Sequence, residues 1–506
     1  MLQKNVLEYL ERSARDFPDK IAYTDETGGI TFSRLLSAAK KIGTKIARTT
    51  ASTNRPIGVI TGRNHHCIAA FMGVLYSGNF YVPIDYEMPS LRLETICSKL
   101  DAPLFLYHEG EEDFLAKLPN ISTLCYGEED EIDEALLCQR REAVLDIDPV
   151  YMIYTSGSTG VPKGIVISHR AVIDFIEWMA DAIGYTHEDV FANQAPFYFD
   201  CSVKDLYLTL KLGATDHILP KKLFMFPTLL MDFLNEKQVT ALTWATSAFH
   251  LVSNSGILSK KKPQYLTKVA IGGEAMLAKH LNNWKAALPQ VKYVNLYGPT
   301  EVTVDCTWYE ITEEFLDHEA IPIGKACANK EVLLLDENLR PVSDGVPGEI
   351  CVRGIGLAKG YYNDSEKTDQ AFVRNPHTPY LDFLYRTGDI AVKRPDGNLV
   401  FQARKDGQIK HMGYRIELGE IERGLNSLEE IAAAICFYDK QKGRIVCVYE
   451  GEKDSKEIAA SLSKILPKYM IPNIYRKVEK MPYNQNSKID RVLLRKEYDH
   501  ETNHGL

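Results

Sequence analysis

The sequence lacks the long apolar runs and paired cysteines that mark membrane and disulfide-rich proteins. No segment of its 506 residues approaches the ~20 consecutive apolar residues that a membrane-spanning helix needs. Its N-terminus shows amphipathic helical spacing and no continuous apolar signal core. The ten cysteines are scattered with no CxxC pair, which argues against a disulfide framework or a zinc site. We therefore expect a cytoplasmic protein without membrane insertion.

A surplus of basic charge is also missing. The chain has 59 Lys and Arg against 68 Asp and Glu, which gives a formal net charge of −9 at pH 7. Nucleic-acid binding depends on clustered positive charge, so this balance argues against nucleic acid as the main partner. With 45% hydrophobic and 25% charged residues, the composition is that of an ordinary globular protein. The length predicts two or more domains.

The most informative segment is residues 154–164, which hold three glycines, four Ser or Thr hydroxyls and one lysine. The apolar and aromatic run before it, 150–154, predicts a buried strand. Glycines let the backbone approach an anion, hydroxyls and N–H groups donate hydrogen bonds, and Lys163 adds a positive charge. These features favour a nucleotide triphosphate as ligand. Gly164 follows Lys163 where a Walker loop needs Ser or Thr, so a P-loop kinase or GTPase is disfavoured.

Apolar strand-like runs alternate with helical patterns through the body of the chain. This alternation predicts a layered α/β architecture with parallel strands. We expect strands at 58–61 and 292–296, and a helix at 170–183 that ends at Gly184. The metal-like triplet 65–67 precedes a helical apolar pattern, so we expect a helix start there and no metal site.

The last third of the sequence is richer in strand patterns. Turns with Asp, Gly and Pro separate the short runs, and the last hundred residues mix strands with a helix, as in a small α+β domain. The predicted strands are 330–335, 349–353, 398–402, 432–438 and 444–449, and the predicted helix is 455–465.

Four further segments match the motifs of one enzyme family in the order in which the family has them. They are 295–301 (NLYGPTE), 385–389 (YRTGD), 403–422 and 486–491 (NSKIDR). With the loop at 154–164 they resemble the adenylate-forming (ANL) superfamily, which includes acyl-CoA synthetases and the adenylation domains of nonribosomal peptide synthetases. The resemblance implies an α/β fold with a large N-terminal domain, 1–405, made of layered α/β subdomains plus a small β-rich part. It also implies a small mobile α+β C-terminal domain, 406–506.

The resemblance implies which residues bind ATP and Mg²⁺. Glu301 would be the magnesium ligand, a role that suits its hard carboxylate oxygens. Tyr297 would offer an aromatic face to adenine, and Asn295 could hydrogen-bond the edge of the purine. Asp389 would accept the ribose hydroxyls in a turn, and Arg404 would contact ribose or phosphate. The complete implied ATP-binding set is Thr155, Ser156, Gly157, Ser158, Thr159, Gly160, Lys163, Asn295, Tyr297, Gly298, Thr300, Asp389, Arg404 and Lys488.

Three residues near the C-terminus are implied in catalysis. Lys488 resembles the catalytic lysine that reaches the substrate carboxylate and the α-phosphate. Asp406 would be the hinge about which the small domain rotates, and Gly413 would let the thiol arm of the acceptor pass close to the backbone. The sequence departs from the family pattern at Ala403 and Ser487, where glycine is usual.

Asp200 indicates that the activated acid is an amino acid. It resembles the aspartate that pairs with the substrate α-ammonium, since a buried carboxylate needs a partner; a helix N-cap is the structural alternative. Lys204 and Asp305 could pair with each other, either could recognise a substrate side chain, or Lys204 could point to solvent. The other implied pocket residues are mostly small or polar, which favours a small or polar amino acid: Cys201, Lys204, Thr243, Ala270, Gly272, Leu296, Val304 and Asp305.

The predicted function is ATP-dependent activation of an amino acid to an aminoacyl-adenylate, with transfer to the phosphopantetheine thiol of a carrier protein. No carrier module follows Arg491 in this sequence, so we expect a separate carrier protein. Length and layout also resemble D-alanine–D-alanyl carrier protein ligases, which makes D-alanine a specific alternative. A second alternative is an acyl-CoA ligase for a non-amino carboxylic acid. A non-catalytic binding relative is disfavoured, because Glu301, Asp389 and Lys488 are all present.

Overall fold

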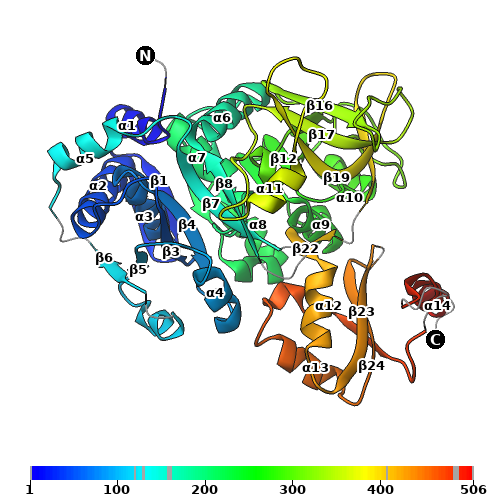
Figure 1. Cartoon of the computed structure of the whole chain (residues 1–506). Coiled ribbons are helices and arrows are strands. Elements are labelled where there is room, and N and C mark those ends of the chain that lie inside the picture. Colours follow the sequence, from blue (N-terminus) through cyan, green and yellow to red (C-terminus); the bar gives the residue numbers. More distant parts are fainter. Residues whose placement is uncertain are drawn as a thin grey trace. The chain divides into compact units, whose positions relative to one another are not determined.

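The computed structural model describes residues 3–118, 121–127, 131–156, 162–405, 408–440, 442–482 and 489–503. The chain divides into two compact units (Figure 1). The first unit comprises Met1–Tyr86, Lys99–Tyr154 and Gly164–Lys405. The second unit comprises Glu87–Ser98, Thr155–Lys163 and Asp406–Leu506. Within the described ranges, no helix is both long enough and apolar enough to cross a membrane.

One sheet of the first unit has six strands in the order β6-β5-β3-β4-β7-β8. The strands are β3 (Pro56–Thr61), β4 (Phe80–Asp85), β5 (Phe105–His108), β6 (Thr123–Tyr126), β7 (Pro149–Thr155) and β8 (Lys163–Ser168). The pairs from β6 through β5, β3 and β4 to β7 are parallel. β3 is buried along its whole length, as an apolar strand covered on both faces should be. The strands predicted at 58–61 and 150–154 are confirmed as β3 and β7.

A second sheet has nine strands in the order β15-β14-β13-β12-β11-β9-β10-β1-β2. They are β1 (Ile21–Asp25), β2 (Gly28–Thr31), β9 (Val190–Asn193), β10 (Thr215–Ile218), β11 (Ala241–Ala245), β12 (Lys268–Gly272), β13 (Lys292–Tyr297), β14 (Thr307–Glu310) and β15 (Lys325–Ala326). The pairs from β13 to β1 are parallel. Both edges are antiparallel, so the expectation of parallel strands is wrong there. Short connections such as β1 to β2 permit only antiparallel pairing, because parallel strands need a crossover.

Helices surround these two sheets (Figure 1). The helices of the first unit are α1 (Leu7–Asp16), α2 (Phe32–Thr49), α3 (His65–Tyr76), α5 (Glu134–Glu142), α6 (His169–Ile183), α7 (Ser202–Leu212), α8 (Pro227–Glu236), α9 (Thr246–Asn254) and α10 (Ala278–Ala287), with the 3-10 turns η1 (Glu112–Lys117), η2 (Lys221–Met225), η3 (Ile257–Ser259) and η4 (Thr300–Val302). α6 ends at Gly184, whose φ of 83° is left-handed, as predicted. The predicted helix start at 65–67 is also confirmed, because the Asn64 side chain caps α3 by accepting the Cys67 N–H.

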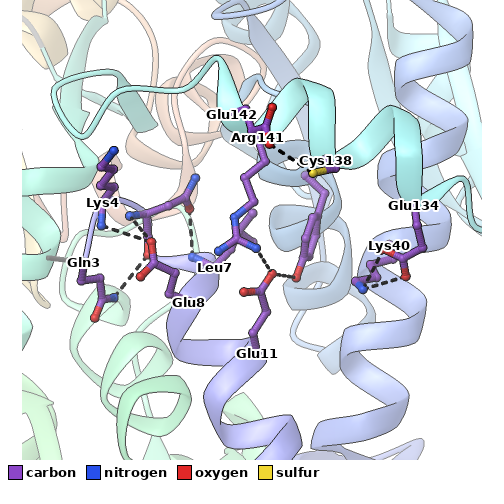
Figure 2. Close-up of polar contacts among 12 residues, drawn as sticks. Gln3, Lys4, Leu7, Glu8, Glu11, Lys40, Glu134, Cys138, Arg141 and Glu142 are labelled. Atoms are coloured by element: carbon purple, nitrogen blue, oxygen red, sulfur yellow. Dashed lines mark hydrogen bonds and ion pairs between the residues drawn. The ribbon is translucent and has the colours of Figure 1, made fainter. Parts of the chain in front are cut away.

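Polar contacts join several helices of the first unit (Figure 2). Glu11 of α1 accepts hydrogen bonds from Arg141 of α5 and, at 3.0 Å, from the hydroxyl of Tyr76 at the end of α3. Lys40 of α2 pairs with Glu134 of α5 at 2.7 Å. The half-buried contacts of Glu11 contribute more to holding the helices together than the more exposed pair of Lys40 and Glu134, because solvent screens exposed charges.

The β-rich part of the first unit is a five-stranded sheet in the order β16-β17-β19-β18, with β20 paired to β19. Its strands are β16 (Lys330–Leu335), β17 (Gly348–Gly354), β18 (Phe372–Arg374), β19 (Phe383–Lys393) and β20 (Leu399–Arg404), and α11 (Ser365–Ala371) precedes β18. The strands predicted at 330–335, 349–353 and 398–402 are confirmed as β16, β17 and β20.

The second unit combines a hairpin, a three-stranded sheet and helices. Its elements are α4 (Ser90–Cys97), β21 (Gln408–His411), β22 (Tyr414–Glu417), α12 (Leu418–Asn426), β23 (Ile431–Asp439), β24 (Arg444–Gly451), α13 (Ser455–Leu462), η5 (Lys468–Met470), β25 (Ile474–Lys477) and α14 (Arg491–Asn503). The predicted strands 432–438 and 444–449 are β23 and β24. A capping box of Asp454 and Glu457 starts α13, which ends at Leu462, earlier than the predicted 465. The fold class predicted from the sequence, α/β with a small α+β part, is confirmed.

Candidate active site

The candidate site begins where β13 ends and the chain turns back over its own backbone. Asn295 and Tyr297 lie on β13 and are buried. The Asn295 Nδ2 donates to the Pro322 carbonyl at 2.8 Å, so this amide group holds a neighbouring segment. At Gly298 a Cβ would lie 2.5 Å from both the Asp305 Cα and the Val304 carbonyl oxygen. Only glycine therefore lets the connection 299–306, the β13–β14 loop, pack this closely.

The β13–β14 loop has a strained backbone. Thr303 and Val304 have φ of 62° and 66°, in the left-handed region that β-branched residues avoid. Lys330 of β16 holds this conformation: its ammonium group donates to the carbonyls of Val302 at 3.1 Å and Asp305 at 2.6 Å. Sequence reasoning missed Lys330, and no motif of the chain singles it out.

Glu301 lies at the centre of η4 and is completely buried. The Tyr361 hydroxyl donates to its Oε1 at 2.9 Å, and the Ala358 N–H donates to its backbone carbonyl. Sequence reasoning also missed Tyr361. Among the described residues there is no group of three or more His, Cys, Asp and Glu that could hold a metal ion. A carboxylate such as that of Glu301 is a type of ligand that Mg²⁺ takes together with phosphate and water oxygens.

Asp389 lies in an irregular stretch of β19. The sequence predicts a turn at 385–389, but the structure shows a continuous strand with a register shift, in which Gly388 has a φ of 73°. The turn prediction is wrong because a β-bulge uses the same glycine conformation without ending the strand. The Asp389 backbone pairs with that of Arg404 on β20, which places the two side chains together.

The Asp389 carboxylate is held from two sides. Its Oδ1 accepts a hydrogen bond from Arg404 Nη1 at 2.6 Å, and its Oδ2 accepts one from the Tyr297 hydroxyl at 2.5 Å. Arg404 also donates to the Thr387 carbonyl at 3.1 Å. Burial and the negative charge of Asp389 raise the pKa of Tyr297 well above its usual value, so its hydroxyl stays protonated as a donor. The structure thus brings together Tyr297, Asp389 and Arg404, which lie far apart in the sequence.

Asp200 lies just before α7 and does not cap it. The N-cap of α7 is Cys201, and that end of the helix has no side-chain capping hydrogen bond. The helix-cap alternative for Asp200 is therefore wrong. The other residues predicted for the pocket fall on α7, on the neighbouring strands β11, β12 and β13, and in the β13–β14 loop, which are parts of the first unit.

Lys204 and Asp305 form a buried ion pair. Their side chains are 0% and 4% exposed, and Lys204 Nζ lies 3.6 Å from Asp305 Oδ2. The possibility that Lys204 points to solvent is therefore wrong. Burial alone would lower the pKa of the Lys204 ammonium, but the charge of Asp305, and then those of Cys201, Asp205 and Asp200, raise it overall. These charges favour the protonated form of Lys204 inside the first unit.

Predicted pocket residues lie on the two adjacent strands β11 and β12, and Gly272 at the end of β12 lies near Asp305. Thr243 of β11 and Ala270 of β12 are neighbours in register, and both are buried. Thr243 donates its hydroxyl to Asp205, so it is already engaged. At Gly272 of β12 a Cβ would lie 3.3 Å from Asp305 Oδ1. The carboxyl ends of parallel strands are the usual place for a ligand site in open α/β sheets.

The remaining predicted residues belong to the second unit, except Thr300, which belongs to the first. Gly157, Ser158, Thr159 and Gly160 of the phosphate loop, the hinge Asp406 and the lysine Lys488 lie outside the described residues. Thr155 ends β7, Lys163 begins β8, and Thr300 begins η4. Ser156 donates to the Arg415 carbonyl at 2.6 Å, a contact within the second unit. Gly413, with φ of 83°, forms the β21–β22 turn with Met412.

Comparison with known proteins identifies the family to which this fold and site belong. The model of the family "AMP-binding enzyme" matches residues 10–362. Two solved structures that contain adenylation and PCP domains of NRPS proteins share the architecture. One of them, holo-PA1221 bound to a vinylsulfonamide inhibitor, has a TM-score of 0.84 at 24% identity and covers 97% of this chain and 84% of that chain. The chain belongs to the AMP-binding enzymes of the adenylate-forming (ANL) superfamily.

Among curated proteins, the chain is similar to peptide and natural-product synthases. Tyrocidine synthase 1 of Brevibacillus parabrevis is 30% identical over 97% of this chain, which covers 45% of that protein. Zwittermicin A synthase ZmaJ of Bacillus cereus is 32% identical over 94% of this chain, which covers 92% of that protein. The chain thus spans less than half of the first relative and almost all of the second.

Proposed function

We propose that this chain activates an amino acid with ATP and passes it to the phosphopantetheine thiol of a separate carrier protein. The observation that carries the proposal is the 2.5 Å hydrogen bond from Tyr297 to Asp389. Tyr297 precedes the β13–β14 loop, which bears Glu301, and Asp389 lies in the β19 bulge beside Arg404. One hydrogen bond therefore joins the strand that leads into the Glu301 loop to the residues proposed for ribose.

In the first half-reaction, a substrate carboxylate oxygen forms a bond to the α-phosphorus of ATP. The bond from that phosphorus to the bridging oxygen breaks, and pyrophosphate leaves. The carboxylate is already ionised at neutral pH, so no base is required. Positioning and charge neutralisation provide the catalysis. We assign these roles to the loop from Thr155 to Lys163 and to Lys488, and we assign a Mg²⁺ to Glu301, where it would neutralise phosphate charge.

In the second half-reaction, a thiolate sulfur forms a bond to the acyl carbon. The bond from that carbon to the phosphate oxygen breaks, and AMP leaves. We propose that residues 406–506 act as a mobile domain that rotates about Asp406 between the two steps, as domain closure does in many enzymes. The positive φ of Gly413 supports its proposed place beside the thiol arm, because a glycine offers no side chain there.

The substrate class is supported by Asp200 and the small, buried residues near it. We propose that Asp200 binds the α-ammonium of a small or polar amino acid. The names of the relatives support an acceptor on a carrier protein, since the similar structure holo-PA1221 contains adenylation and PCP domains. We propose that ATP and Mg²⁺ complete the reaction.

Amino-acid-dependent exchange of labelled pyrophosphate into ATP tests the proposal. We expect exchange with one or a few members of a panel of D- and L-amino acids, D-alanine included, and loading of a holo carrier protein with the labelled amino acid. Exchange with fatty or aryl acids only would support the acyl-CoA ligase alternative and overturn the proposal. ATP binding without exchange on the whole panel would indicate a non-catalytic relative.

Lys488→Ala separates the two half-reactions. We expect exchange to fall by at least ~100-fold, because the variant loses the charge proposed to act on the α-phosphate. Thioester formation from added aminoacyl-adenylate should be largely unchanged. Lys496→Ala on the exposed face of α14 is the matched control and should leave both steps intact. An equal loss of both half-reactions in Lys488→Ala would contradict the assigned role.

A further inference from the structure

Two opposite charges are buried side by side in the first unit without a hydrogen bond. Lys204 Nζ and Asp305 Oδ2 lie 3.6 Å apart, which is beyond hydrogen-bonding distance. Both atoms are enclosed, and neither has a hydrogen-bond partner among the residues that the structure describes. Buried polar atoms are nearly always bonded, and leaving one unbonded is costly. The pair therefore has an ammonium group and a carboxylate oxygen whose hydrogen-bonding capacity no described protein group uses.

Two other buried or half-buried lysines of this unit have hydrogen-bonding partners. Lys330 donates to two carbonyls, at 2.6 and 3.1 Å. Lys268 of β12 lies 2.7 Å from the Asp189 carboxylate. The fold thus satisfies lysines where their role is structural. Lys204 differs from Lys330 and Lys268, because it lies too far from Asp305 for a hydrogen bond. This arrangement is expected of groups that bind a ligand.

We propose that Lys204 and Asp305 together recognise the side chain of the amino acid substrate, and that this side chain is a primary carboxamide. The inference rests on the proposed function, because it assigns the substrate of the same site. The carboxamide oxygen would accept from the Lys204 ammonium, and its NH₂ would donate to Asp305 Oδ2. The carboxamides among common amino acids are asparagine and glutamine.

Charge balance selects a neutral side chain. The Lys204–Asp305 pair has no net charge, Asp200 is assigned to the substrate α-ammonium, and Asp205 accepts hydrogen bonds from Asn193 and Thr243. A substrate carboxylate would therefore add an unpaired negative charge beside Asp305. An ammonium or guanidinium group would add a positive charge beside Lys204. Unpaired buried charges are strongly disfavoured. An apolar side chain would leave Nζ and Oδ2 unbonded, as they are in the free protein, and would gain neither hydrogen bond, so it should bind less well than a carboxamide.

Geometry favours a carboxamide over a hydroxyl group. Standard amide bond lengths place the oxygen and nitrogen of a carboxamide about 2.3 Å apart. Two nearly parallel hydrogen bonds can then reach two protein atoms 3.6 Å apart. A hydroxyl group must donate and accept through one oxygen, so its two bonds would meet at a sharp angle. At Gly272 a Cβ would lie 3.1 Å from the Leu296 carbonyl oxygen and 3.3 Å from Asp305 Oδ1, so a larger residue there would crowd the Asp305 carboxylate.

Matched substrates test the inference on the unaltered protein. Pyrophosphate exchange is measured with two matched sets: asparagine with aspartate and leucine, and glutamine with glutamate and methionine. Threonine and lysine are added, and the amino acids are tested as D- and L-isomers. We expect kcat/KM for a carboxamide to exceed that for its acidic and apolar counterparts by at least ~100-fold, as for sites built to hydrogen-bond a polar group. A preference for an apolar, charged or hydroxyl side chain would overturn the inference and leave the proposed function standing. Exchange with no amino acid at all would instead overturn the proposed function.

A double variant identifies the two residues as the source of the preference. Lys204→Met with Asp305→Leu removes the donor and the acceptor together and leaves no unpaired charge. We expect the ratio of kcat/KM for carboxamide over apolar substrate to fall to about one or below, with the KM for ATP nearly unchanged. Lys268→Met removes another ion pair of the first unit, that with Asp189, and should keep the preference. If the double variant folds and keeps the preference, the assignment of Lys204 and Asp305 is wrong. If the double variant does not fold, the substrate panel on the unaltered protein tests the inference.

Discussion

Among the single residues of the candidate site, Asp389 is held in the most defined orientation. Its Oδ1 accepts from Arg404 at 2.6 Å and its Oδ2 accepts from Tyr297 at 2.5 Å. Each carboxylate oxygen has two lone pairs, so each retains one for a ribose hydroxyl. The side chain is thus oriented before a nucleotide binds, which reduces the entropic cost of binding.

Tyr297→Phe tests this preorganisation by removing one hydroxyl donor. We expect the KM for ATP to rise about 10-fold with a smaller effect on kcat, because a hydrogen bond to a charged group is worth about 1.5–3 kcal/mol. Tyr309→Phe is the matched control, since Tyr309 also donates to a carboxylate, that of Glu313, at 2.7 Å. Steady-state exchange kinetics measure both variants. An unchanged KM in Tyr297→Phe would show that Arg404 alone orients Asp389.

The sequence predicts which residue types belong to the site better than it predicts their contacts. The positions of Glu301, Asp389 and Arg404 follow from motifs, whereas Lys330 and Tyr361 belong to none of the motifs. The Lys330 ammonium group donates a hydrogen bond to a carbonyl 28 positions away in the sequence, and the Tyr361 hydroxyl donates one to a carboxylate 60 positions away. Such partners are set by the packing of separate strands, and no local pattern of one sequence encodes that packing.

Among the elements, the β13–β14 loop has the backbone conformation that depends most on contacts with the rest of the first unit. It carries Glu301 and Asp305 on a backbone in which Thr303 and Val304 adopt left-handed φ values. Such conformations cost of order 1–3 kcal/mol each and persist only where other contacts impose them. Two features impose this one: the ammonium group of Lys330 and the absence of a side chain at Gly298.

Lys330→Met tests the first feature. The variant keeps the length of the side chain but leaves two buried carbonyls without their donor, so we expect a loss of about 2–4 kcal/mol in the free energy of unfolding. We also expect kcat/KM to fall at least ~10-fold for every substrate alike, since the loop positions Glu301 and Asp305 together. Lys359→Met, at an exposed position before β18, is the control. Loss of stability with full activity would limit Lys330 to a structural role.

Gly298→Ala tests the second feature. The added Cβ would meet backbone atoms at 2.5 Å, which flexible side chains cannot relieve, so the loop must move. We expect exchange activity to fall by at least ~100-fold while circular dichroism shows a folded chain. Gly127→Ala adds a methyl group with nothing within 4 Å and should be neutral. A fully active Gly298→Ala variant would show that the loop can shift without consequence.

At the scale of elements, the periodicity of apolar residues predicts where strands and helices lie, but it does not predict where they are irregular. β3, β13 and α6 fall where apolar runs and a terminal glycine predict them. The Gly388 bulge in β19 has the same local signature as a turn, and only pairing with β17 and β20 distinguishes the two. α13 ends at Leu462, although the apolar residues of the same cluster continue to Ile465 and Leu466, so the apolar pattern alone overestimates its length.

For the whole molecule, buried ionisable groups make stability depend on pH. Burial lowers the pKa of His169 to about 3 and that of His217 to about 4. Burial also lowers the pKa of His250 to about 3, with a further contribution from the positive charge of His280. Asp205 acts in the opposite sense, because burial raises its pKa to about 6 despite its hydrogen bond from Thr243.

The sign of each effect follows from which state binds more protons. Between pH 6.5 and about 3 the unfolded chain protonates His169 and the folded chain does not, so acidification favours unfolding and stability rises with pH. Between pH 3.8 and about 6 the folded chain keeps the Asp205 proton and the unfolded chain loses it. Stability from Asp205 therefore falls as pH rises, which partly offsets the histidines.

His169→Gln isolates the first effect, since His169 is fully buried and accepts only the Val6 N–H at 3.4 Å. With an unfolded pKa near 6.5, the His169 contribution lost between pH 7.5 and pH 5.0 is about 2 kcal/mol. We expect the fall in urea midpoint between these pH values to shrink in His169→Gln and to be unchanged in His318→Gln, an exposed control. Asp205→Asn should steepen the fall, because it removes the opposing contribution. The two variants must therefore shift the pH dependence in opposite directions, and a shift in the same direction would show that changes in packing, not proton binding, dominate both.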